Sequence, residues 1–316
     1  MRRELETLAE DDPFIRVPDL LTANLYLKLE FINPVGSNDF KTAIALIRSW
    51  EAAGRIKRDS VVVEAAGGSL GVALAMICAE RGYRFLNFVG PNTSAKTVAS
   101  MKALGAEVVC ASPQESPIDH VRDLTSRDAR YIWASRDENE SSREVYADLT
   151  AAAITHHFPR IDYLFVDAGE AILRGYVQHF ARWRPQTKIV GVYSRGDPGT
   201  IHSPFNYDPC SMISVPQEAA ISSCRFLARS YGILVGRISG AVMAAVLSRR
   251  ASFCQGEVVV AIAPDPGELY LETIYNDDWV ITEFGDDALR PELYVRLLEA
   301  CVFYEQSQPI RVAAYA

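Results

Sequence analysis

The sequence predicts an α/β protein with mostly parallel sheets flanked by helices. Short β-branched runs alternate with apolar helical patterns, and turn-forming residues separate them. Strand, turn, helix and strand repeated at this pace are typical of parallel strands joined by crossover helices. The chain has 316 residues, which is enough to bury a large core, and we expect it to form two lobes.

In chain order, the first half is expected to contain strands at residues 26–30, 61–63, 85–89, 107–110 and 131–134. A Gly-rich turn and an apolar helix follow the strand at 61–63. The second half repeats the pattern with strands at 163–166, 188–193 and 257–262. Residues 199–216 are rich in Pro, Ser and Asn and are interpreted as a surface loop.

Composition narrows the function classes. The net charge of −8 argues against non-specific nucleic-acid binding, which needs a basic surface. The start, MRRELETLAEDD, has no apolar signal core, and no apolar run reaches the ~20 residues of a membrane helix. Six scattered cysteines, two of them (Cys78 and Cys224) in helical patterns, are interpreted as reduced, buried thiols. We therefore expect a cytoplasmic protein without a membrane partner.

Residues 28–41, KLEFINPVGSNDFK, lead from a strand end through an Asn-Pro turn into a helix. This segment resembles the active-site entry of the fold-type II pyridoxal phosphate (PLP) enzymes, which have a tryptophan synthase β-like architecture. The nearest branch is the cysteine synthase and 2,3-diaminopropionate-precursor synthase group of β-substituted alanine synthases. Residues 61–83, 91–109 and 258–280 resemble further segments of the family, in the same order and at similar spacing.

The resemblance implies a smaller inserted lobe at residues 38–132 and a larger lobe formed by residues 1–37 and 133–316. It also implies a cofactor between the lobes, at strand ends and helix N-termini. The family pattern Asn-Pro-x-Gly-Ser-x-Lys carries the lysine that forms the Schiff base with PLP. Here that position is Asp39, and an acid cannot form an imine. Lys41 is the alternative lysine, but it lies about 200° around a helix from Asp39.

Residues 65–71, AAGGSLG, resemble the loop that holds the substrate carboxylate in the family. The Asn that contacts PLP is replaced by Ser69, and a Ser is replaced by Gly67. Backbone N–H groups at Gly67, Gly68, Ser69 and Gly71 are the expected binders of a substrate carboxylate or other small anion. Close packing of helix against strand explains the glycines equally well.

Two further segments resemble cofactor contacts. Residues 167–175 follow a strand where the family has a small-residue phosphate loop, but they carry Asp167, Glu170, two bulky apolar residues and Arg174. Acids beside a phosphate are repulsive by roughly 1 kcal/mol. Asp265 stands where the family faces the pyridine nitrogen, and is interpreted either as a retained contact or as an Asx-type turn. Residues 236–240 put Arg237 and Ser239 near the same place.

No metal site is expected, because His156 and His157 are adjacent and no third ligand follows at metal spacing. Three function hypotheses remain open. The first is a degenerate homologue that binds no PLP and acts as a pseudoenzyme or partner subunit in siderophore or antibiotic biosynthesis. It would form a homodimer, or a heterodimer with a homologue.

The second hypothesis is a PLP-independent enzyme with a rebuilt cleft, lined by Asp39, Ser69, Glu170, Arg174, Arg237 and Asp265, for an amino-acid-like ligand. The third is an active PLP-dependent β-elimination or β-replacement enzyme that uses Lys41. Whether the chain is an enzyme stays open. No cofactor is expected under the first two hypotheses, and PLP is expected only under the third.

Overall fold

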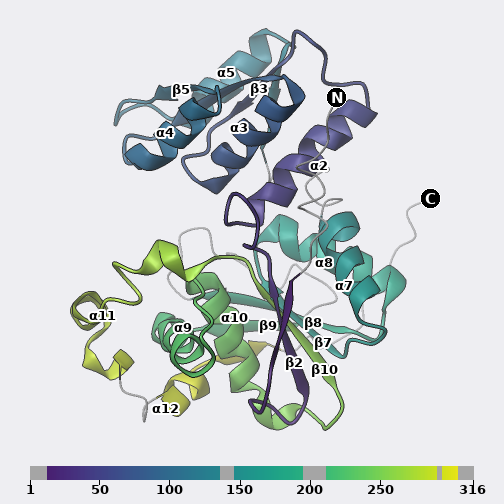
Figure 1. Ribbon diagram of the computed structural model, residues 1–316, viewed down its shortest axis with the longest axis vertical. Coiled ribbons are helices and arrows are strands. Elements are labelled where there is room, and N and C mark those ends of the chain that lie inside the picture. Colours follow the sequence, from purple (N-terminus) through teal and green to yellow (C-terminus); the bar gives the residue numbers. More distant parts are fainter. Residues whose placement is uncertain (1–12, 136–145, 195–210, 290–293, 305–316) are drawn as a thin grey trace. The chain divides into compact units, whose positions relative to one another are not determined.

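The computed structural model describes residues 13–135, 146–194, 211–289 and 294–304. The chain divides into two compact units, whose elements are labelled in Figure 1. Among the described residues, unit 1 comprises 32–135 and 146–149, and unit 2 comprises 13–31, 150–194, 211–289 and 294–304. The predicted smaller lobe, residues 38–132, lies wholly within unit 1, and its exact limits stay a prediction.

Unit 1 contains a parallel sheet in the order β5-β4-β3-β6. These strands are β3 (Val61–Glu64), β4 (Arg84–Val89), β5 (Glu107–Cys110) and β6 (Tyr131–Trp133). They are rich in valine and aromatic residues, which pack well on a pleated surface. All four strands predicted between residues 61 and 134 are confirmed.

The helices of unit 1 alternate with these strands. They are α2 (Asp39–Ala52), α3 (Ser69–Arg81), α4 (Ala95–Ala103) and α5 (Pro117–Arg127). Ser94 and Ser116 cap α4 and α5 by accepting hydrogen bonds from backbone N–H groups of the first turn. One apolar cluster joins α2 and α3 to a face of the sheet, and a second lies under Val121 of α5.

Unit 2 contains a seven-stranded sheet in the order β1-β2-β10-β7-β8-β9-β11 within the described residues. The outer pairs β1–β2 and β9–β11 are antiparallel, and the inner pairs are parallel. The strands are β1 (Phe14–Val17), β2 (Asn24–Leu29), β7 (Tyr163–Asp167), β8 (Lys188–Ser194), β9 (Ser211–Val215), β10 (Val258–Ala263) and β11 (Val302–Tyr304).

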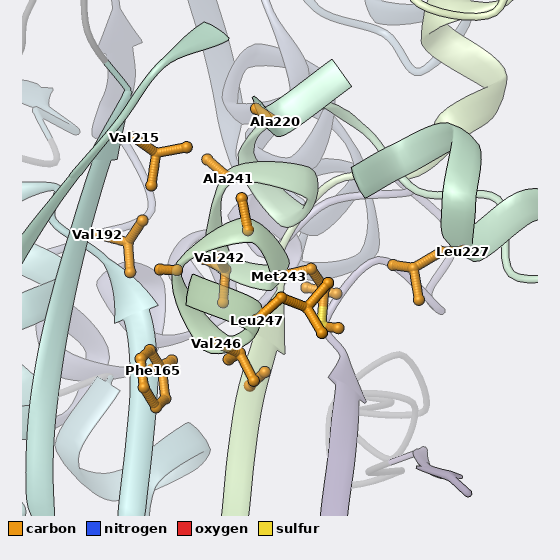
Figure 2. Packing of buried hydrophobic residues seen from close by; sticks show 14 of the residues in the cluster. Phe165, Val192, Val215, Ala220, Leu227, Ala241, Val242, Met243, Val246 and Leu247 are labelled. Atoms are coloured by element: carbon orange, nitrogen blue, oxygen red, sulfur yellow. The ribbon is translucent and has the colours of Figure 1, made fainter. Parts of the chain in front are cut away.

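Helices cover this sheet, and α10 contributes more buried apolar residues to its core than any other described helix. Figure 2 shows side chains of α10 packed between Phe165, Val192 and Val215 of the sheet and residues of α9. The helical segments are η1 (Tyr146–Ala151), α7 (Ala152–His157), α8 (Glu170–Trp183), α9 (Gln217–Tyr231), α10 (Arg237–Ser248), η2 (Arg250–Ser252), η3 (Gly267–Tyr270), α11 (Asp277–Phe284), η4 (Asp286–Leu289) and α12 (Tyr294–Glu299). No described helix is both long and apolar enough to span a bilayer.

The predicted surface loop at 199–216 is wrong in its last part. Residues 211–215 form β9, with four of its five residues buried in the sheet. The Pro- and Ser-rich flanks mask this short apolar run, whose burial comes from pairing with β8. Residues 199–210 lie outside the described residues. The prediction of reduced, buried thiols is confirmed for Cys78 and Cys224, which are free and buried on helices. Burial is wrong for Cys110 and Cys254, which are free but exposed, because Cys110 ends the edge strand β5 and Cys254 lies in the turn after η2.

Candidate functional site

The site expected from the sequence divides between the two units, and each part is described within its own unit. Asp39, Lys41 and the loop 65–71 belong to unit 1, whereas Glu170, Arg174, Arg237, Ser239 and Asp265 belong to unit 2.

In unit 1, the N-termini of α2 and α3 are joined by a side-chain hydrogen bond. Asp39 is the first residue of α2, is buried, and accepts a bond from the Ser69 hydroxyl at 2.5 Å. Ser69 is the first residue of α3. The N-termini of α2 and α3 both favour a nearby carboxylate, because the backbone N–H groups there carry partial positive charge. Asp39 is therefore tied to the loop that the family resemblance assigns to the substrate carboxylate.

The loop between β3 and α3 is held by a buried amide that sequence reasoning missed. Asn87, in the middle of β4, accepts a bond from the Ala66 N–H at 3.1 Å and donates to the Ala66 carbonyl at 2.8 Å. Glu64 accepts from the Ala65 N–H at 2.7 Å. A fully buried polar residue inside the apolar run RFLNFV is the signal that points to this role.

The glycines of this loop serve different purposes. A Cβ on Gly71 would lie 2.6 Å from the Ala66 carbonyl, so close packing requires glycine there. Gly68 is exposed, has no atom within 4 Å of an added Cβ, and precedes α3 without a side-chain cap. Gly67 is also exposed, and its Cβ would meet the Thr93 hydroxyl at 2.6 Å. The backbone beside Gly68 is therefore open to a small anion, whereas Gly71 is structural.

Lys41 is 5% exposed and lies in the first turn of α2. At 3.6 residues per turn it projects about 200° from Asp39. Both residues are thus enclosed, but they face different sides of the same helix.

In unit 2, Asp265 caps the start of α10. One carboxylate oxygen accepts from the Ser239 N–H at 2.9 Å and the Ser239 hydroxyl at 2.7 Å. The other accepts from the Ile238 N–H at 3.1 Å and the Tyr270 hydroxyl at 3.0 Å. A carboxylate offers about four acceptor positions, and these four donors fill them. The structure therefore assigns Asp265 a capping role that neither reading of the sequence contained.

The surroundings of Asp265 are closely packed. A Cβ on Gly236 would lie 2.2 Å from the Asp265 carboxylate and 2.5 Å from the Tyr270 ring. Burial, and then the neighbouring Asp265 charge, raise the pKa of Tyr270 above its ordinary range. Tyr270 therefore stays a protonated donor. Arg237, half-buried, is the first residue of α10 beside this network.

The segment expected to replace the phosphate loop follows β7. Asp167 ends β7, and its carboxylate accepts from the Gly169 N–H at 3.2 Å. Leu173 is fully buried, so its side chain packs inside unit 2 and does not line an open loop. Its Cδ2 would lie 3.0 Å from a Cβ on Gly191. Arg174 is half-buried on α8, whereas the Glu170 side chain lies outside the described part.

A scan against protein-family models matches residues 6–206 to the family described as pyridoxal-phosphate dependent enzyme. The match covers more than half of the chain. The chain belongs to the pyridoxal-phosphate dependent enzyme family. The family resemblance and the α/β fold class predicted from the sequence are therefore confirmed.

Two relatives from this family are similar to this chain along most of their length. Cysteine synthase of Staphylococcus aureus (strain N315) is 30% identical over 291 residues, covering 83% of this chain and 92% of the relative. O-ureido-L-serine synthase of Streptomyces lavendulae is 28% identical over 291 residues, covering 84% and 88%. A crystal structure of O-ureido-L-serine synthase has a TM-score of 0.74 at 23% identity, covers 92% of this chain and 97% of its own, and establishes the fold.

Family membership makes PLP a plausible ligand, which the sequence led us to expect only under the third hypothesis. The residues present depart from what the family resemblance implies at three positions. Asp39 offers no amine for an imine. Asp265 has its acceptor positions filled by groups of its own unit. Asp167 takes the Gly169 N–H, a backbone donor in the expected phosphate loop. These three positions do not fit PLP in the manner that the family resemblance implies.

Proposed function

We propose that this chain is a homologue of the β-substituted alanine synthases that forms no PLP imine and serves as a partner subunit in amino-acid-derived biosynthesis. The observation that carries the proposal is Asp39 at the position of the Schiff-base lysine. Its carboxylate is buried and bonded at 2.5 Å to Ser69. An acid at this position cannot form an imine, and its hydrogen bond to Ser69 holds it beside the loop at residues 65–71.

Unit 2 supports the proposal independently. A cofactor that needs a hydrogen-bond acceptor for its pyridine nitrogen would have to displace a backbone N–H, a hydroxyl or Tyr270 from Asp265. Leaving one of these buried donors without a partner costs about 1–3 kcal/mol. Restoring a lysine in unit 1 would not remove that cost.

The ligand class follows from the open backbone beside Gly68 and from the relatives. Cysteine and O-ureido-L-serine, the amino acids in the relatives' names, are both alanines substituted at the β-carbon. We propose an amino acid of this kind as the small ligand, and a homodimer, or a heterodimer with an active homologue, as the assembly.

A second candidate is a PLP-dependent β-elimination or β-replacement enzyme that uses Lys41. Two observations favour it: the family is PLP-dependent, and Lys41 is an enclosed lysine in the same helix turn as Asp39. When bound, PLP would supply an electron sink for chemistry at the β-carbon of an amino acid.

The deciding experiment is an absorbance spectrum of the purified full chain after incubation with PLP and desalting. Wild type, Asp39→Lys and Lys41→Ala are compared, and Lys57→Ala, on an exposed loop after α2, is the matched lysine control. Borohydride reduction followed by peptide mass analysis identifies any modified lysine. We expect no retained visible band in any of the four proteins.

A band in wild type that is lost in Lys41→Ala, but kept in Lys57→Ala, would replace the proposal by the second candidate. A band only in Asp39→Lys would mean that one substitution accounts for the loss of the imine and that unit 2 still accepts the cofactor. If none of the four proteins retains a visible band, the proposal stands, and amino-acid ligands and homologous partners are tested next. It leaves the rebuilt, PLP-independent cleft to be tested by amino-acid turnover.

A further inference from the structure

A cavity of about 450 Å³ lies within unit 1, along the edge strand β6. Small-molecule sites typically enclose about 300–1,000 Å³. Its wall includes Arg55 just beyond α2, Thr125 of α5, and Tyr131, Ile132 and Trp133 of β6. The cavity therefore has the size of a ligand site and is built from three elements of one unit.

This cavity is separate from the site around Asp39. Arg55 follows the C-terminal end of α2, whereas Asp39 begins that helix of 14 residues. At a rise of 1.5 Å per residue, the two ends are about 20 Å apart. A ligand held by Arg55 would not touch the Asp39–Ser69 pair.

The charge of the cavity favours an anion. Arg55 is exposed and makes no ion pair with a described residue, and its one recorded side-chain contact is with the Trp50 ring at 5.7 Å. The described residues that line the cavity include no acid. A guanidinium in this setting presents a planar fork of donors that matches a carboxylate.

The aromatic wall is held in place before any ligand arrives. Tyr131 and Trp133 are two residues apart on β6, so both lie on the same face of the sheet, against the cluster under α5. The Trp133 indole N–H donates to Glu64 at 3.2 Å, and Arg122 lies over the ring at 5.7 Å. Fixed rings lose little freedom on binding and suit a flat, apolar partner.

Thr125 of α5 adds polar surface to the cavity. Its hydroxyl lies 2.9 Å from the Val121 carbonyl and 3.2 Å from the Arg122 carbonyl, so its proton is used within α5 and a carboxylate would depend on Arg55 for a donor. The Arg55 cation and the fixed rings thus line one cavity. We propose that this cavity binds a small aromatic carboxylate, at a site independent of the one around Asp39.

The test is isothermal titration of the full chain with phenylacetate, and with 2-phenylethanol and phenethylamine as neutral and cationic matches. The key variant is Arg55→Gln. The matched control is Lys57→Gln, which removes an exposed cation two residues away and outside the cavity wall. We expect saturable phenylacetate binding that weakens about tenfold in Arg55→Gln, as for loss of a charge-assisted bond, and is unchanged in Lys57→Gln.

A second readout locates the ligand. Phenylacetate should quench tryptophan fluorescence in wild type, and the quench should disappear in Trp133→Phe, whose circular dichroism checks the fold. Any of three results overturns the proposal: no saturable binding of phenylacetate, equal affinity for phenethylamine, or equal weakening by the Arg55 and Lys57 variants. The last result would mean that surface charge alone attracts the probe.

Discussion

Asp39 in unit 1 and Asp265 in unit 2 are both buried carboxylates beside a helix N-terminus, yet their surroundings differ. Asp39 accepts a hydrogen bond from Ser69, and the exposed turn at Gly68, next to that serine, has no atom within 4 Å of an added Cβ. Asp265 accepts from four donors, and there is no space for a Cβ on Gly236 between its carboxylate and the Tyr270 ring. The unit 1 site keeps room for a ligand, whereas the unit 2 site is closed upon itself.

The two sites show that the residue type at a position does not by itself determine what its side chain does. Asp265 has the residue type that some relatives of the resembled branch carry there, but it stabilises the start of α10. Asp39 departs from the family pattern, but it lies at a loop that still offers open backbone. A pattern match at one position therefore says less about function than the number of partners that the side chain already has.

The largest expected difference between the two sites is in the free energy of unfolding after one methyl group is added to each. In Gly236→Ala the new Cβ would lie 2.2 Å from the Asp265 carboxylate, so the network must shift. We expect the free energy of unfolding to fall by about 3 kcal/mol, at the upper end for overpacking. Urea unfolding followed by circular dichroism measures this change.

Gly68→Ala is the matched control, because nothing lies within 4 Å of its Cβ and its φ of −123° suits any residue. It should change the same free energy by less than about 1 kcal/mol, in either direction. Equal losses in the two variants would contradict the distinction between an open and a closed site.

Replacing each aspartate by asparagine should change the stability by a smaller amount, and again by different amounts at the two sites. In Asp265→Asn, one oxygen becomes an NH₂ group that must face two donors, so we expect a loss of about 2 kcal/mol. In Asp39→Asn, the Ser69 hydroxyl can turn from donor to acceptor, so the loss at this hydrogen bond should stay below about 1 kcal/mol. Thermal unfolding of both variants tests this order, and a reversed order would mean that Asp39 is the more constrained acid.

Sequence reasoning predicted the fold better than the site, for a physical reason. The strands at 61–63 and 163–166 are local runs of apolar residues, and burial follows from their pattern. The cap on α10 joins Asp265 to Ser239, residues 26 positions apart that meet only in the folded unit. The Asn87 clamp on Ala66 spans 21 positions in the same way. Long-range polar pairing leaves no periodic signal in a sequence, although a polar residue inside an apolar strand marks the place.

The smallest expected difference between the two sites is in how their stability depends on pH. Each carboxylate accepts a hydrogen bond from a different kind of hydroxyl. Ser69 donates to Asp39 and does not titrate in the range of protein stability, whereas Tyr270 donates to Asp265 and does. Burial and the Asp265 charge hold the pKa of Tyr270 above its ordinary value of 10.0. Tyr270→Phe should therefore cost about 1 kcal/mol at neutral pH through loss of this hydrogen bond.

The sign of the pH dependence follows from proton linkage. Above pH 10 the unfolded chain releases the Tyr270 proton while the folded chain retains it, so the stabilisation by Tyr270 is full below that pH and declines as pH rises. The difference in unfolding free energy between wild type and Tyr270→Phe should shrink between about pH 10 and pH 11. The difference between wild type and Ser69→Ala should stay constant over the same interval. Because other tyrosines titrate in all three proteins, only these differences are compared. A constant Tyr270→Phe difference would mean that folding does not raise the pKa of Tyr270, and hence that its hydroxyl is not enclosed beside Asp265 in solution.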